Sequence, residues 1–243
     1  MTWREFESRV HRKLLSLGWD VRRAAPAPQG WASGRAYWEP EYLKGLGFNP
    51  GTLIDVGVAG GTPQLYRAFP DAYLVLIEPL TECVTDIEGI LRSRPGEHVP
   101  VALGQEPGVR NLRVEPREPS KTSFYERHRR ERTGDTPAIR QVAVDTLDRV
   151  MSARRFPRPF GLKIDAEGAE LEILHGAAAT LSETEFVIVE AGMGCRFHGG
   201  CGLADLVGEL DRNGFRAVDI LDIGRDATSR AAFLDLVFER RHV

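Results

Sequence analysis

The chain has 243 residues, enough for one large α/β domain or two small ones. Its 32 Lys and Arg residues against 35 Asp and Glu residues give a net charge of −3, which provides no overall basic field for a nucleic-acid partner. No apolar run approaches the ~20 residues of a membrane span, and the polar start MTWREFESRVHRK argues against export, so we expect a cytoplasmic protein.

The first 49 residues are interpreted as a helical extension and linker. Apolar residues recur at helical spacing from Trp3 to Leu17, which predicts an amphipathic helix over residues 2–17. A stretch rich in Pro, Gly and Ala follows at 22–35 and is typical of a linker or an ordered loop. We therefore expect the main domain to span residues 50–243.

Strand and helix patterns alternate from residue 50 onward, which predicts a three-layer α/β fold with a mostly parallel sheet. Only GRDATSR separates the last two predicted strands, so they should form an antiparallel hairpin. The predicted strands are 52–57, 72–79, 98–103, 160–165, 185–192, 216–223 and 231–240, with further pieces at 109–116 and 139–147. The predicted helices are 63–69, 81–94, 166–181 and 203–215.

The first predicted strand runs into a glycine-rich turn, DVGVAGGT, at residues 55–62. Gly57 allows a sharp turn, while Gly60 and Gly61 let a ligand approach the backbone closely. No Gly-Lys-Ser/Thr follows, which disfavours a P-loop, and Asp55 replaces the first glycine of a dinucleotide fingerprint. Taken alone, the turn fits a simple strand-to-helix connection equally well.

The acidic residues around this turn narrow the choice of ligand. Glu78 ends the next predicted strand, where a carboxylate suits a ribose diol. Asp55 suits an amine-bearing ligand and would repel a pyrophosphate. Together they favour a nucleoside that carries a positive group, such as S-adenosylmethionine, with Thr62 closing the turn around it.

A second acidic group lies at the ends of later strands. Asp165 follows the strand in LKIDAEGAELEILHGA (162–177), and Glu190 ends the strand in VIVEAG. Because both strand ends face the ligand crevice, these carboxylates could bind a divalent cation such as Mg²⁺, act as a general base or hold a substrate. One of them could instead only cap a loop. Stabilisation by a helix N-terminus accounts for Glu167 and Glu170.

The chain resembles the FkbM-type methyltransferase family over roughly residues 50–192. The resemblance lies in the order and spacing of the segments DVGVAGGT, IEP, VDTLDRV, LKIDAEGAELEILHGA and VIVEAG. The resemblance implies a Rossmann-like class I fold, with seven strands in the order 3-2-1-4-5-7-6, and an S-adenosylmethionine-dependent O-methyltransferase. Its acceptor would be a small molecule with a hydroxyl group, such as a secondary metabolite, a sugar or a glycolipid. Carried over by motif, the cofactor would be held by Asp55, Gly57, Gly60 and Glu78, by Ala102 and Leu103 beside the adenine, and by Asp165 near the methyl group. Only Gln105 offers a polar contact to the adenine.

Several further residues are weaker candidates. His198, on the loop after Glu190, could deprotonate an acceptor hydroxyl, whereas His175 is expected on the surface. Cys195, His198 and Cys201 lack the paired spacing of a four-ligand zinc site. The basic segment 121–132 is either a solvated surface or a lid over the acceptor pocket, with Ser120 and Ser123 as polar groups. The aromatic residues Trp31, Tyr37, Trp38 and Tyr42 could line the same pocket or pack the extension.

Three hypotheses about function therefore stand side by side. The first is an O-methyltransferase in which Asp165 and Glu190 form the polar floor of the site. The second is an NAD-dependent oxidoreductase, disfavoured by Asp55 at the turn. The third is a non-catalytic scaffold that retains the cofactor pocket. A homo-oligomer is possible under each of them.

Overall fold

The computed structural model describes residues 38–115, 118–128 and 136–241. The chain divides into two compact units, Met1–Arg35 and Ala36–Val243, and all elements below belong to the second. The predicted helix 2–17, the predicted linker 22–35, and the aromatic residues Trp31 and Tyr37 lie outside the described residues. Within the described ranges, no helix is both long and apolar enough to cross a membrane.

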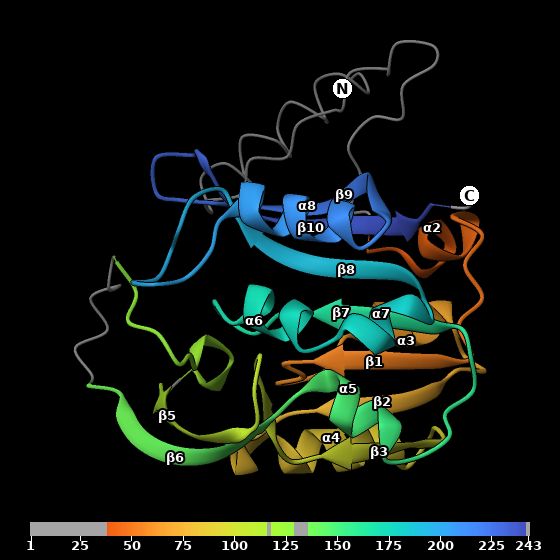
Figure 1. The fold of residues 1–243 in the computed structure, drawn as a ribbon, viewed down its shortest axis with the longest axis horizontal. Helices are drawn as coiled ribbons and strands as arrows, with labels where there is room; N and C mark the ends of the chain where they lie inside the picture. The colour runs from red at the N-terminus through yellow and green to blue at the C-terminus, as the bar shows by residue number, and fades with distance from the viewer. Residues whose placement is uncertain (1–37, 116–117, 129–135, 242–243) are drawn as a thin grey trace, which may run out of the picture. The chain divides into compact units, whose positions relative to one another are not determined.

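A seven-stranded sheet with the order β3-β2-β1-β7-β8-β10-β9 forms the centre of the unit (Figure 1). Strand β10 runs antiparallel to both β8 and β9, and the other pairs are parallel. The predicted class I order and the predicted C-terminal hairpin are therefore confirmed. The strands are β1 (Thr52–Val56), β2 (Tyr73–Ile77), β3 (Gly96–Val99), β7 (Phe160–Ile164), β8 (Thr184–Gly192), β9 (Phe215–Arg225) and β10 (Ala231–Arg240).

Helices cover both faces of this sheet. Every residue of β1 and β7 is buried, as expected for central strands that pack against helices on two sides. One apolar core joins the sheet to α5 (Leu147–Ser152), α6 (Glu170–His175), α7 (Ala178–Ser182) and α8 (Leu203–Arg212). The other joins it to α2 (Pro40–Gly45), α3 (Pro63–Ala68) and α4 (Val84–Leu91), which follows the short η1 (Thr81–Cys83).

The predicted strand 98–103 is wrong as a single element. Strand β3 ends at Val99, and β4 (Ala102–Leu103) belongs to a second sheet of order β4-β6-β5. Pro100 lies between them, and a proline cannot donate to a strand ladder. Strands β5 (Gly108–Val114) and β6 (Ala138–Asp145) are antiparallel and lie beyond the carboxyl ends of β1 and β2 (Figure 1). The small sheet therefore borders the crevice in which a ligand is expected.

The predicted helix 166–181 is also interrupted. Residues 166–169 form a turn before α6, with positive φ angles at Glu167 (48°) and Gly168 (107°). Between α6 and α7, a Cβ on Gly176 would collide with the carbonyl oxygen of Gly104, so the chain approaches the small sheet where only glycine fits. A shaped loop, and not a helix, therefore follows the end of β7.

Candidate functional site

The glycine turn after β1 touches the end of β7. Gly57 has a φ of 74°, and a Cβ at this position would overlap the carbonyl oxygen of Asp165. The Gly57 N–H donates to Ile77 O (3.1 Å) and the Asp165 N–H to Val56 O (3.1 Å), so the ends of three strands are tied together. Only glycine satisfies both the backbone angle and the close approach. Gly60, in contrast, has open space where its Cβ would be.

Asp55 lies beneath this turn and faces the protein interior. Its side chain is 0% exposed and borders neither of the cavities described below. One oxygen accepts from the hydroxyls of Thr62 (3.1 Å) and Tyr66, and the other accepts from the ammonium of Lys163 (3.1 Å). Asp55 is therefore paired with Lys163 and shapes the turn from below, and this arrangement gives no support to the expected contact with a ligand amine.

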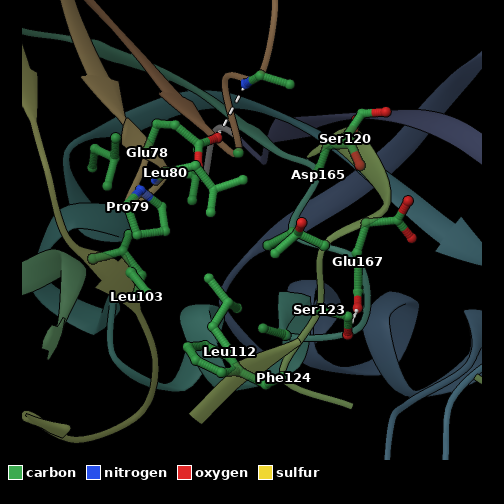
Figure 2. A pocket seen from close by; sticks show the side chains of 18 of the residues that line it. Glu78, Pro79, Leu80, Leu103, Leu112, Ser120, Ser123, Phe124, Asp165 and Glu167 are labelled. Carbon is green, nitrogen blue, oxygen red and sulfur yellow. Dashed lines mark hydrogen bonds between the residues drawn. The ribbon is translucent and has the colours of Figure 1, made fainter. Parts of the chain in front are cut away.

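Two cavities open on either side of the turn and share Gly57, Ala59 and Asp165. We call them the apolar slot and the polar compartment. The apolar slot is lined chiefly by Val56, Ile77, Glu78, Leu80, Ala102, Leu103, Leu112, Phe124 and Glu167 (Figure 2). The polar compartment is lined chiefly by Trp38, Gly60, Gly61, Thr62, Gln64, Lys163, Glu190 and Asp235.

Glu78 supplies the carboxylate of the apolar slot. Its two oxygens accept from the N–H groups of Ala59 (3.1 Å) and Leu80 (3.0 Å), which fixes the side chain at the rim of the turn. Burial raises the pKa of Glu78, and the two backbone N–H groups oppose that shift. Figure 2 shows Glu78 across the slot from Asp165 and Glu167, with Leu112 and Phe124 between the two sides. Glu78, which is predicted to bind the ribose, therefore lines the same cavity as Ala102 and Leu103, which are predicted to flank the adenine.

The roof of this slot comes from the insertion between β5 and β6. Pro119 in η2 (Pro119–Lys121), Ser120 and Phe124 border the slot. The Ser123 hydroxyl donates to Glu167 O (2.6 Å), which ties the roof to the loop after β7. Of the predicted lid 121–132, residues 122–124 border the apolar slot, and residues 129–132 lie outside the described ranges.

Three carboxylates from neighbouring strands line the polar compartment. Asp165 is 39% exposed and lies 3.8 Å from the Lys163 ammonium. Glu190 pairs with Arg196, and Asp235 accepts from the indole N–H of Trp38 (3.0 Å). Burial and the nearby Asp165 charge raise the pKa of Glu190 although Arg196 opposes the shift, and burial raises the pKa of Asp235 to about 6.

These carboxylates do not fit a divalent metal site. Mg²⁺ needs several oxygen ligands at ~2 Å, whereas Asp165 already pairs with an ammonium and Glu190 with a guanidinium. In the part of the chain that the structure describes, no group of three or more His, Cys, Asp or Glu side chains is arranged to hold a metal ion. The predicted Mg²⁺ site at Asp165 and Glu190 therefore finds no support in the donor set.

The acidic residues after Asp165 stabilise the loop by direct contacts. Glu170 is buried and accepts from the N–H groups of Ala166 and Gly168 (3.0 Å each), while burial raises its pKa to about 7. Glu167 pairs with Arg127 (2.8 Å) and Arg196 (3.3 Å). Glu167 precedes the helix, so the expected helix-dipole explanation is wrong for it.

His198, His175 and Gln105 line neither of the two cavities. His198 is exposed and packs edge-on against His128, with ring centroids 3.9 Å apart. Gln105 is exposed, and neither it nor His198 lines the slot or the compartment. The expected roles of His198 as a base and Gln105 as an adenine contact are therefore not supported. His175 lies at a partly exposed position near Glu209 (3.4 Å), and Cys195 and Cys201 are free thiols.

Sequence reasoning missed Lys163 and Asp235. Each interrupts an otherwise apolar strand, in FGLKI and FLDLVF, and a charged residue in a strand buried on both faces is the signal that could have marked them. Trp38, one of the aromatic residues expected near the acceptor, does line the polar compartment.

Two solved methyltransferases are similar to this chain, and the first shares its fold. The first, methyltransferase FkbM from Methylobacillus flagellatus KT, is 16% identical to this chain in sequence and has a TM-score of 0.50. The match covers 83% of this chain and 50% of that one. Magnesium protoporphyrin IX methyltransferase from Synechocystis PCC 6803 is 13% identical with a TM-score of 0.46; the match covers 83% of this chain and 76% of that one. This chain thus matches only half the length of the first structure. No curated protein sequence matches.

The sequence model of the methyltransferase FkbM domain matches residues 55–217. This range contains the glycine turn, Glu78, the loop after β7 and Glu190, and therefore residues of both cavities, whereas Trp38 and Asp235 lie outside it. Because the match covers more than half of the chain, this protein belongs to the FkbM methyltransferase domain family.

Proposed function

We propose that this protein transfers the methyl group of S-adenosylmethionine to a hydroxyl group of a small molecule. One observation carries the proposal: a single glycine turn lies between a mostly apolar slot, with Glu78 at its rim, and a compartment lined by charges of both signs. The cofactor has the same division, with an apolar adenine and a ribose diol at one end and a charged amino-acid group at the other.

The apolar slot suits adenosine. Leu103, Leu112 and Phe124 offer flat apolar surface to a base. Each Glu78 oxygen accepts one backbone N–H and keeps acceptor capacity for a ribose hydroxyl. The backbone contacts hold Glu78 in place before any ligand arrives, which lowers the cost of ordering it on binding.

The polar compartment suits the sulfonium and the amino-acid group. Arg196 pairs with Glu190, whereas Asp165 is 39% exposed beside the Lys163 ammonium and offers its carboxylate to a positively charged ligand. The pyrophosphate of NAD would meet these carboxylates, which disfavours the oxidoreductase. When bound, S-adenosylmethionine supplies an electrophilic methyl group whose bonding electrons remain on sulfur.

The chain's own contribution is to position the acceptor and remove its proton. Asp165 borders both cavities. Its side chain is more exposed than that of Glu190, the other carboxylate of the compartment that forms an ion pair. In the proposal, it accepts the hydroxyl proton as the acceptor oxygen attacks the methyl carbon. Holding both reactants at the turn lowers the entropic cost of their encounter. We expect the acceptor to be a secondary metabolite, a sugar or a glycolipid.

Calorimetry with S-adenosylhomocysteine, S-adenosylmethionine and NAD tests the cofactor. We expect saturable binding of the first two and none of NAD; saturable NAD binding without S-adenosylhomocysteine binding would overturn the proposal. Transfer of a labelled methyl group to a panel of hydroxyl compounds then separates an enzyme from a binding scaffold. A wild-type protein that binds cofactor and methylates an acceptor, with an Asp165→Asn variant that binds but does not methylate, supports the enzyme.

A further inference from the structure

Lys163 links the buried base of the glycine turn to the wall of the polar compartment. It lies opposite Asp55 in the register of β1 and β7, so both side chains emerge on the same face of the sheet. The ammonium lies 3.1 Å from one Asp55 oxygen and 3.8 Å from one Asp165 oxygen. Its side chain is 9% exposed, and what remains exposed borders the compartment.

Asp55 anchors this ammonium. It is fully buried, and its second oxygen is occupied by the hydroxyls of Thr62 and Tyr66, so it has little freedom to move. Burial by itself would lower the pKa of Lys163, but the Asp55 and Asp165 charges outweigh it and raise the pKa, which keeps the ammonium charged. Lys163 is thus a fixed positive charge at the back of the compartment.

Asp165 depends on this charge more than its neighbours do. Glu190 is held by Arg196, and Asp235 by the Trp38 indole. Within the described residues, Asp165 forms one ion pair, with Lys163. Of these two side chains, that of Asp165 is the more exposed to solvent. Without the ammonium, the Asp165 side chain would be free to turn toward solvent.

We propose that Lys163 is a positioning residue for Asp165: anchored by Asp55, its ammonium holds one Asp165 oxygen and directs the carboxylate into the compartment. The inference rests on the proposed function, which places the sulfonium beside Asp165. The alternative is that Lys163 only balances the buried charge of Asp55.

A double variant distinguishes the two roles. Lys163→Met alone leaves Asp55 buried without its cation and is expected to destabilise the fold. Asp55→Asn together with Lys163→Met removes both charges, and the Asn carbonyl oxygen can still accept from Thr62 and Tyr66. Thermal unfolding checks that the double variant is folded. Lys163→Arg keeps the cation, and Arg154→Met, which removes an exposed ion pair to Glu97, is the matched control.

The measurement is the ratio of the Kd for S-adenosylhomocysteine to the Kd for S-adenosylmethionine, by calorimetry. A carboxylate beside the sulfonium raises this ratio, because only the second ligand carries that charge. We expect Asp165→Asn and the double variant to lower the ratio by about threefold or more, the order expected for one partly exposed charge pair. Lys163→Arg and Arg154→Met should stay within about twofold of the wild type.

Each other outcome overturns the inference in a recognisable way. A wild-type ratio in the double variant, with a lowered ratio in Asp165→Asn, would show that Lys163 only balances Asp55. An equal loss of affinity for both ligands would show that Lys163 binds the cofactor itself. An unchanged ratio in Asp165→Asn would remove Asp165 from the sulfonium. A wild-type protein that binds neither ligand would instead refute the proposed function, on which the inference rests.

Discussion

The apolar slot and the polar compartment share the same glycine turn but are held in shape by different forces. In the slot, Glu78 is fixed by backbone N–H groups, and most of the other lining side chains are apolar. In the compartment, the carboxylates are held by other side chains: an ammonium, a guanidinium and an indole.

This difference has a functional consequence. Backbone contacts and apolar packing are little screened by salt, so the slot should bind its ligand much the same way over a wide range of salt concentration. The ion pairs of the compartment, in contrast, are affected by the charge of any ligand that binds there. We therefore expect substitutions in the slot to change cofactor affinity, and substitutions in the compartment to change chemistry and charge preference.

The strongest test removes the boundary between the two regions. Gly57→Ala places a Cβ where the Asp165 carbonyl oxygen lies, at a φ of 74°. We expect a destabilisation of about 3 kcal/mol or more, and loss of S-adenosylhomocysteine binding, measured by urea unfolding and calorimetry. Gly60→Ala is the matched control, because open space surrounds its Cβ position. Equal behaviour of the two variants would refute the close approach.

Two carboxyl groups with raised pKa values, Glu170 at the start of α6 and Asp235 on β10, should make stability depend on pH. Burial raises the pKa of Glu170 from 4.5 to about 7 and that of Asp235 from 3.8 to about 6. At a pH between the ordinary and the raised pKa of each group, the native state binds more protons than the unfolded state. The free energy of unfolding therefore falls as the pH rises through this range. For Glu170 the difference of about 2.5 pKa units corresponds to roughly 3 kcal/mol.

Urea unfolding at about pH 5 and about pH 7.5 measures this dependence. We expect the wild type to be more stable at the lower pH, and Glu170→Gln to show a smaller difference because it cannot ionise. Glu82→Gln is the control: hydrogen bonds from Arg140 lower the pKa of Glu82 to about 2, well below this window. A wild type that is more stable at about pH 7.5 would contradict the burial of these neutral carboxyl groups.

A smaller effect should separate the carboxylates of the two cavities. Glu78→Ala removes the acceptor at the rim of the slot and should weaken S-adenosylhomocysteine binding by about tenfold or more, since hydrogen bonds to charged groups contribute ~1.5–3 kcal/mol. Asp165→Asn should change that affinity by less than about threefold while abolishing methyl transfer. Calorimetry and a transfer assay measure both. If Asp165→Asn weakens binding as much as Glu78→Ala, the division of labour between the cavities is wrong.

The smallest effect is expected outside both cavities. His198 is exposed and packs on His128, so His198→Ala should keep cofactor affinity and methyl transfer within about twofold of the wild type. The same assays, run beside Glu190→Gln, provide the comparison. A loss of turnover in His198→Ala with unchanged binding would restore His198 as the base.

Local patterns in the sequence were sufficient for much of the fold and for the slot. Alternating apolar strands and helices predict the sheet, and the short link GRDATSR predicts the antiparallel hairpin. Parallel strands bring their carboxyl ends to one edge, so Gly57, Glu78 and Asp165 could be expected to meet. These inferences succeed because each depends on the period of a segment or on the residue at its end.

What only the tertiary structure decided is which charges pair. Asp55 and Lys163 are 108 positions apart, and their contact exists only because β1 and β7 lie side by side in one register. The same holds for the position of Phe124 at the roof of the slot, and for that of His198, which packs on His128 and does not line the slot. Residue type and spacing placed an acid at the turn, but burial and a neighbouring strand determine whether that acid meets a ligand or a lysine.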